Sequence, residues 1–258
     1  MSAPKLERRS LLLGAATLTG ASLLPRTAPA FGEEGAFHAR ILSTGGTRLT
    51  GPRGSAPGRW AWELVRRTSA PARMSAAVVA ADAATLFHEP FVIWAGESEV
   101  PPLTARELRG LREYLRLGGV LVVDDTRPED GSFGRAARRE LQRVLPDSSV
   151  VPLDARHVVY KSYYMIERPV GRVLGPPRLE AIVRGKDARV LFSSHDLLGA
   201  LAREGSTWAF EVAPGGSAQR QNAIRLAVNL AMYVLCSDYK DDQVHAPWLM
   251  RRRARRPR

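Results

Sequence analysis

Short apolar runs alternate with segments whose apolar residues recur every three or four positions, from residue 39 onward. The first pattern is typical of buried strands and the second of amphipathic helices. Several of the runs are apolar without a break, which indicates strands buried on both faces and therefore a mostly parallel sheet. The strands are expected at 39–43, 76–81, 91–95, 120–123 and 150–153, and the helices between them at 60–68, 104–117 and 133–145.

The segment 104–117 carries the most complete helix signal in the chain. Thr104 and Glu107 have the spacing of a capping box, in which each side chain bonds the other residue's backbone N–H. Leu108, Leu111 and Leu115 share one face, and the pair of glycines at 118–119 ends the helix.

The second half of the chain is less regular. Two apolar runs, 179–183 and 188–193, flank a short polar turn and predict a hairpin at one edge of the sheet. A last helix is expected over about 218–235, and the Gly- and Pro-rich stretch 44–58 is expected to be a loop. Together the elements predict one α/β domain, residues 37–240, with the three-layer sandwich of Rossmann-like or flavodoxin-like proteins.

Composition places the chain among ordinary globular proteins, and the position of its charges argues against nucleic-acid binding. Of its 258 residues 45% are hydrophobic and 25% are charged, and the formal net charge is +12. Much of that charge sits at the two termini, and no basic stripe interleaved with aromatics crosses the body. The lone cysteine, Cys236, excludes an intramolecular disulfide framework and a cysteine-rich metal cage, so we expect it to be a small buried hydrophobe.

The first thirty residues have the pattern of a twin-arginine export signal. Arg8 and Arg9 precede an uncharged apolar stretch, and Ala28 and Ala30 form a small-x-small cleavage site. The apolar stretch 11–24 would reach about 21 Å as a helix, short of the roughly 30 Å core of a bilayer. We therefore expect a periplasmic protein, tethered to the membrane if Pro29 prevents removal of the signal.

The basic tail, residues 241–258, ends in six arginines within eight residues. Such a cluster would favour an anionic membrane surface by about 1 kcal/mol for each charge near it. A solvated tail with no partner is the other interpretation.

Candidate site residues lie just beyond the predicted strand ends, where open α/β sheets bind their ligands. These residues could hold a divalent cation or perform acid–base chemistry. For Asp125 and Asp196 the favoured interpretation is that each caps the helix or turn that follows it. The candidates are Gly96, Glu97, Asp124, Asp125, Ser194, His195 and Asp196.

Motifs for the common catalytic mechanisms are missing. Ser194, His195 and Asp196 are consecutive, so in a strand their side chains would alternate between faces and could not act as a triad. No nucleophile elbow, P-loop or dinucleotide-binding glycine motif occurs, and no cofactor is predicted. His157 with Tyr160, Tyr163 and Tyr164 forms a polar aromatic cluster that packing explains more simply than binding.

Several segments together resemble the bacterial and archaeal family called domain of unknown function 4159. The segments are Phe37 to Arg40, Leu111 to Asp125, Phe133, Arg138 to Leu141, Pro146, Pro152 to Tyr164, Ser194 to Leu197, and Asn229. The resemblance implies a fold similar to class I glutamine amidotransferases and their non-enzymatic relatives. It also implies partners in the cell envelope, because members are often encoded near MoxR-type ATPases and von Willebrand A-type proteins.

Two departures bear on activity. Many members carry Gly-His-Gly where this chain has Gly96-Glu97-Ser98, and no cysteine stands at a strand-to-helix elbow as amidotransferases require. Fold similarity alone therefore does not imply glutaminase activity. The leading hypothesis is a non-catalytic domain that binds a partner or small ligand at the strand ends, and the alternative is a metal-dependent hydrolase that uses carboxylates and His195 there.

Overall fold

The computed structural model of the chain describes residues 35–240. The predicted signal residues Arg8, Arg9, Ala28 and Ala30, and the predicted tail 241–258, lie outside the described residues. Among the residues described, no helix combines the length and apolar character needed to cross a membrane.

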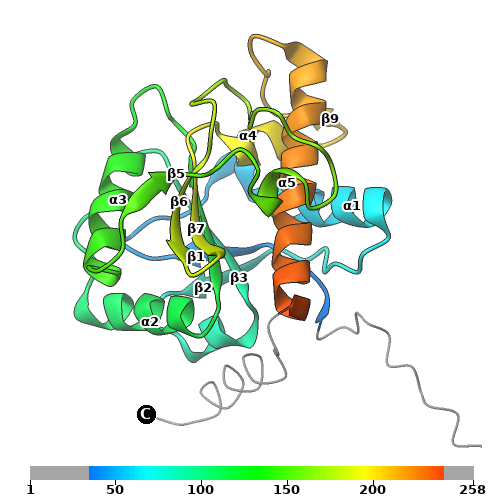
Figure 1. The fold of residues 1–258 in the computed structure, drawn as a ribbon. Coiled ribbons are helices and arrows are strands. Elements are labelled where there is room, and N and C mark those ends of the chain that lie inside the picture. Colours follow the sequence, from blue (N-terminus) through cyan, green and yellow to red (C-terminus); the bar gives the residue numbers. More distant parts are fainter. Residues whose placement is uncertain (1–34, 241–258) are drawn as a thin grey trace, which may run out of the picture. The chain divides into compact units, whose positions relative to one another are not determined.

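A seven-stranded sheet forms the centre of the fold, in the order β2-β1-β3-β4-β7-β6-β5 (Figure 1). Strands β2, β1, β3, β4 and β7 are parallel, while β6 is antiparallel to both β7 and β5. The sheet strands are β1 (Arg40–Ser43), β2 (Ala77–Ala80), β3 (Phe91–Gly96), β4 (Val120–Asp125), β5 (Val150–Pro152), β6 (Glu180–Arg184) and β7 (Asp187–Ser193).

Helices cover both faces of the sheet, which confirms the predicted α/β sandwich (Figure 1). One layer holds α1 (Ala56–Thr68), α4 (Leu197–Leu201) and α5 (Gly216–Lys240), and the other holds α2 (Ala105–Arg116) and α3 (Ser132–Val144). Between residues 35 and 240 the structure also contains three short 3-10 helices, η2 (Gly51–Ser55), η3 (Ala84–His88) and η4 (Val158–Tyr160), and a small hairpin, β8 (Arg203–Glu204) with β9 (Thr207–Trp208).

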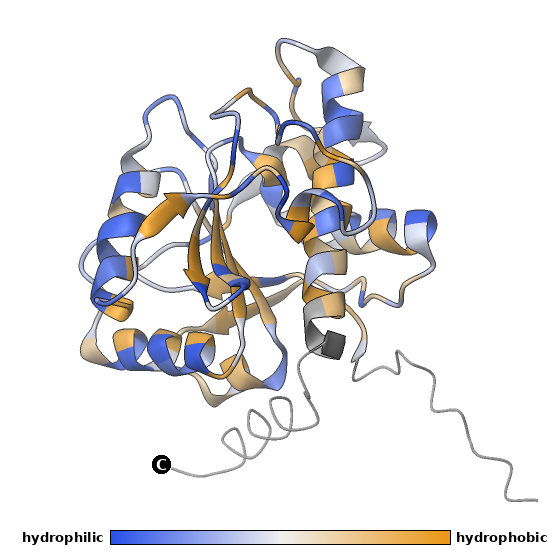
Figure 2. Cartoon of the chain, in the orientation of Figure 1, coloured by the Kyte–Doolittle hydropathy of each residue, from blue (hydrophilic) through white to orange (hydrophobic). Residues whose placement is uncertain are grey.

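Alternation along the central strands produces two separate apolar cores. Phe91 and Ile93 of β3 face the layer of α1, α4 and α5, while Val92 and Trp94 face α2 and α3. Because successive strand residues point to opposite faces, an unbroken apolar run is what a two-sided core requires. In Figure 2 the central strands are accordingly orange, and blue residues lie along the helices that cover them.

The capping box predicted at 104–107 is present. Thr104 accepts a hydrogen bond from the Glu107 backbone, and the Glu107 carboxylate accepts one from the Thr104 backbone in return. The same carboxylate also accepts the Thr44 hydroxyl and the Gly45 N–H, at 2.8 and 2.9 Å. Glu107 therefore holds the turn after β1 as well as the start of α2.

Three predicted elements differ from the structure. Helix α1 begins at Ala56, inside the stretch expected to be a loop, because Pro57 is compatible with the first helical turn and η2 leads directly into it. The predicted hairpin, β6 with β7, has β5 paired outside β6, so β5 is the outermost strand. The last helix extends beyond both predicted ends, to Gly216 and Lys240.

Cys236 is exposed, and the expectation of a buried cysteine was wrong. The buried stripe of α5 includes Val234 and Leu235. Cys236 is one residue further along, and each residue turns a helix by about 100°, since a turn takes 3.6 residues.

Candidate functional site

The strand register brings the predicted site residues to one edge of the sheet. Ala95 pairs with Asp124 and Gly96 with Asp125 between β3 and β4, and Asp124 pairs with Ser193 between β4 and β7. The strand edge is defined here as the candidate residues Gly96, Glu97, Asp124, Asp125, Ser194, His195 and Asp196.

Asp124 at the end of β4 holds the start of α4. Its carboxylate is fully buried, with Oδ1 accepting the Leu197 N–H at 2.9 Å and Oδ2 the Leu198 N–H at 2.8 Å. Burial, and then the charge of Asp196, raises the pKa of Asp124 to about 7, although the two amides oppose this. Both oxygens are therefore engaged with backbone, and neither reaches solvent.

Asp196 is the centre of an ionic lock that connects three separated segments. Its fully buried carboxylate accepts Arg53 Nε at 3.0 Å and Arg53 Nη2 at 2.6 Å, and it also pairs with Arg172 Nε. It caps α4 as well, accepting the Gly199 N–H at 2.9 Å. Asp196 has φ of 52°, a left-handed conformation that Asp tolerates better than most residues.

Arg53 and Arg172 are site residues that the sequence analysis did not identify. Arg53 lies in η2, 143 positions before its partner, and also donates to the Thr126 carbonyl. Its guanidinium stacks over the Phe210 ring at 4.3 Å from the centroid. No local pattern marks either arginine, because the lock forms only when three distant segments meet.

Asp125 and Gly96 both contact helix α3, in the other helical layer. Asp125 accepts N–H groups from Arg127 and from Gly134 in α3, and burial raises its pKa. A Cβ on Gly96 would lie 2.5 Å from the Phe133 ring, so only glycine fits there. Glu97 is exposed, and it is the carboxylate of the strand edge that a partner can reach.

His195 is buried beneath the loop that precedes β6. Its Nε2 lies 3.0 Å from the Pro176 carbonyl and must therefore carry the proton. Burial lowers the pKa of His195 to about 4, so the ring is neutral at pH 7. Ser194 is half-buried, and the His195 ring and the Asp196 carboxylate have different partners.

Two of the predicted candidates for a cation are already occupied by donors. A cation at Asp196 would have to displace guanidinium groups, and one at Asp124 would have to displace amides. Within residues 35–240 as described, no group of three or more His, Cys, Asp or Glu side chains has an arrangement that could hold a metal ion.

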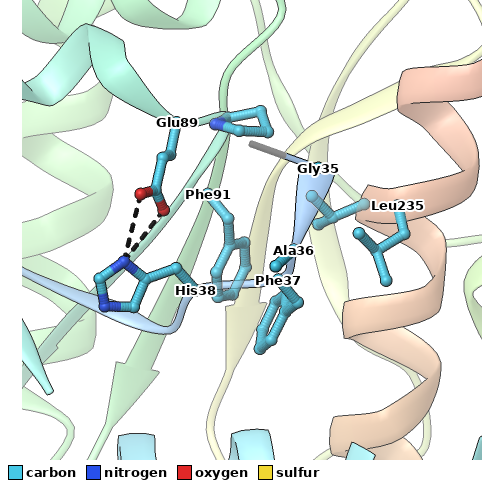
Figure 3. A pocket seen from close by; sticks show the side chains of 9 residues that line it. Gly35, Ala36, Phe37, His38, Glu89, Phe91 and Leu235 are labelled. Carbon is cyan, nitrogen blue, oxygen red and sulfur yellow. Dashed lines mark hydrogen bonds and ion pairs between the residues drawn. The ribbon is translucent and has the colours of Figure 1, made fainter. Parts of the chain in front are cut away.

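A second cluster lies at the opposite ends of the strands (Figure 3). His38 Nδ1 and Arg73 Nη1 approach Glu89 at 3.1 and 2.7 Å, and Arg40 Nε is 3.7 Å from it. Burial acts to raise the pKa of Glu89, but its hydrogen bond to His38 and the nearby positive charges outweigh this and lower it. The adjoining cavity, about 20 Å³ in volume, has room for about one water molecule.

The polar aromatic cluster serves mainly to attach a loop to α5. Tyr160 is buried and its hydroxyl accepts the Leu179 N–H at 2.8 Å. Asn229 of α5 accepts the Tyr164 N–H and donates to the carbonyls of Val159 and Tyr164. Tyr163, in contrast, remains 47% exposed.

A family model described as Domain of unknown function (DUF4159) matches residues 44–235. The chain belongs to this family. The DUF4159 match begins directly after β1 and ends in the last turns of α5, so it includes the strand edge, Arg53 and Arg172. A search of curated proteins found no match to the chain.

Proposed function

We propose that this DUF4159 protein is an exported, non-catalytic binding domain of the cell envelope, which contacts a partner or small ligand at its strand edge. The observation that carries the proposal is that the polar groups there, apart from Glu97 and Ser194, are buried and mostly bonded within the protein. Asp124, Asp125 and Asp196 hold the protein's own backbone and arginines, and His195 is 1% exposed. A general base must reach the proton it removes, and these groups do not reach solvent.

Export is proposed from the twin-arginine pattern. Replacing Arg8 and Arg9 with lysine keeps the positive charge but removes the paired guanidinium groups. We expect this double variant to accumulate in the cytoplasm while the wild-type protein fractionates with the periplasm. An unchanged distribution would contradict export by this route.

The basic tail is proposed to touch anionic lipid. Cosedimentation with phosphatidylglycerol vesicles should decrease when residues 251–258 are removed, because six arginines are lost. Equal binding by the two chains would rule out this role for the tail.

Binding at the strand edge can be tested through Glu97. A photo-reactive p-benzoylphenylalanine at Glu97 should crosslink a defined envelope protein in living cells, because this side chain is exposed at the edge. The same group at Arg109, exposed in the layer of α2 and α3, is the control. The proteins encoded nearby in many relatives, MoxR-type ATPases and von Willebrand A-type proteins, are the proposed partners, and identical products from both positions would contradict the proposal.

We also propose a fold relationship to class I glutamine amidotransferases and their non-enzymatic relatives, which is compatible with a binding role. In this chain Cys236 lies near the end of α5 and not at a strand end. Metal analysis of the purified full chain addresses the hydrolase alternative. A stoichiometric divalent metal lost on Glu97→Gln substitution would favour the hydrolase over the binding domain.

A further inference from the structure

Arginine and tryptophan side chains alternate across the surface between α1 and the β8–β9 hairpin. Arg59 lies over the Trp62 ring at 4.1 Å and over the Trp208 ring at 4.7 Å, so it joins the two elements. Further guanidinium groups extend the stack at each end, with distances to a ring of 4.4 to 4.9 Å. The arginine–tryptophan ladder is defined as Arg66, Trp62, Arg59, Trp208, Arg203 and Arg220.

The ladder carries more positive charge than its own carboxylate balances. Glu63 pairs with Arg59 and with Arg67 outside the ladder. Within the described part of the chain, no carboxylate pairs with Arg66, Arg203 or Arg220. Arg203 and Arg220 lie 4.7 and 4.4 Å from the centroid of the same Trp208 ring, so two like charges are close together there. Burial, and then the charge of Arg203, lowers the pKa of Arg220. An anion bound here would relieve that repulsion.

The stacked arginines differ in the donors they keep for a planar acceptor. Arg220 is buried and donates to the carbonyls of Ala200 and Phe210, and Arg203 donates with Nη2 alone, to the Ser206 carbonyl. Arg66 is exposed, and its guanidinium makes no hydrogen bond within residues 35–240 as described. Stacking occupies the face of a guanidinium and leaves its edge, whose forked N–H groups match a carboxylate. A guanidinium held against a ring also loses less conformational entropy on binding than a free side chain.

Exposed aromatic surface accompanies this charge. Trp62 is 38% exposed, and Tyr163, whose hydroxyl donates to the Arg67 carbonyl, is 47% exposed. Tyr164 packs against Tyr163 at 4.9 Å between ring centroids. Trp, Tyr and Arg are the residues in which binding energy concentrates at protein–protein interfaces. This combination favours a protein partner over a lipid surface, which clustered charge alone would attract.

The ladder also borders the strand edge. Ser55, in the same η2 turn as Arg53, accepts the Arg203 N–H at 2.7 Å and donates to the Arg203 carbonyl at 3.0 Å. A partner that contacts the strand edge near Arg53 can therefore extend onto the ladder.

We propose that the arginine–tryptophan ladder binds an acidic segment of a partner protein, with Arg66 and Arg203 pairing with its carboxylates. The inference deepens the proposed function, because it names the chemistry of the partner. It rests on the binding role but not on export.

The test is titration of a fluorescent ten-residue glutamate peptide with the purified protein. Charge reversal at Arg66 and Arg203 (R66E/R203E) should weaken binding at least tenfold. The matched double reversal R106E/R109E, on exposed residues of α2 in the opposite layer, should change binding less than threefold. The titrations use the full chain and a chain ending at Met250, in which the terminal arginines cannot compete for the peptide.

Arg66→Gln provides a second variant, because Arg66 is exposed and its loss should not disturb folding. It should weaken binding severalfold without changing the melting temperature. Equal weakening by the two double reversals, or no peptide binding by the Met250 chain, would overturn the proposal. If R66E/R203E no longer bound phosphatidylglycerol vesicles but still bound the peptide, the proposal would be overturned, and the ladder would be a membrane-binding surface instead. Failure of Glu97 crosslinking in cells leaves this titration unaffected, so the two proposals fail separately.

Discussion

The two ends of the parallel sheet bury carboxylates in opposite ways. Near the start of β3, Glu89 is surrounded by His38, Arg40 and Arg73, and its pKa is lowered. At the end of β4, Asp124 is held by backbone amides, and its pKa rises to about 7. Charged partners favour the ionised form of a buried acid, whereas burial with a like charge nearby opposes it. The two ends should therefore respond to pH with opposite sign.

Removing an arginine should reduce the free energy of unfolding more beside the strand edge than at the opposite ends of the strands. Arg53→Met leaves the fully buried Asp196 with Arg172 as its one remaining arginine partner, and a broken buried ion pair costs about 3 kcal/mol or more. Arg73→Met is the counterpart at the other end. Its side chain is 39% exposed and Glu89 retains His38 and Arg40, so the cost should be about 1 kcal/mol or less. Urea unfolding of both variants measures the difference, and equal costs would contradict the comparison.

Asp124→Asn should change how stability depends on pH. The unfolded carboxyl ionises near its usual pKa of 3.8 while the folded one keeps its proton up to about 7. The unfolded state thus binds fewer protons between these values, so this group's contribution to stability falls as pH rises. The free energy of unfolding of the wild type, relative to that of Asp124→Asn, should fall by about 2 to 3 kcal/mol between pH 5 and 8.

Asp147→Asn is the control for this experiment, because it makes the same substitution at an exposed position. A wild-type advantage that grows with pH would mean that the Asp124 carboxylate is stabilised in its ionised form.

His195→Gln should change the pH dependence of stability on the acidic side of neutrality. Gln can donate the same hydrogen bond to the Pro176 carbonyl, but it does not titrate. The unfolded histidine takes up a proton near pH 6.5 while the folded one resists until about 4, so the wild type loses stability as pH falls between these values. Between pH 6.5 and 4 the difference in unfolding free energy between the two proteins should change by about 2 to 3 kcal/mol. Parallel pH profiles would show that His195 is accessible to protons.

Glu89→Gln should show the smallest of the three pH-dependent effects, with a sign opposite to that of Asp124→Asn. The ionised Glu89 stabilises the fold above its usual pKa of 4.5, and that contribution disappears as pH falls through its lowered value. At pH 6 the free energy of unfolding of the wild type should exceed that of the variant by about 1 to 2 kcal/mol, and the two values should converge toward pH 3. A difference that is independent of pH would assign the role of Glu89 to packing.

Local patterns were sufficient where neighbouring residues decide the structure. The capping box at Thr104 and Glu107 and the two-sided strands at 91–95 and 120–123 follow from spacing alone, because their hydrogen bonds and packing faces repeat within a few residues. The same reasoning placed the carboxylates at the strand ends. It could not decide between ligand binding and capping, because both roles favour the same residue types.

The amino-acid sequence by itself determined the strands of the main sheet and the longer helices, that the sheet is mostly parallel, and which acids follow its strands. Only the tertiary structure decided what those acids do. Arg53 and Arg172 reach Asp196 from distant segments, and Arg59 joins Trp62 to Trp208 across two elements. The reason is that the charge and contacts of a buried group depend on what surrounds it in space, and those neighbours come from parts of the chain that no local pattern connects.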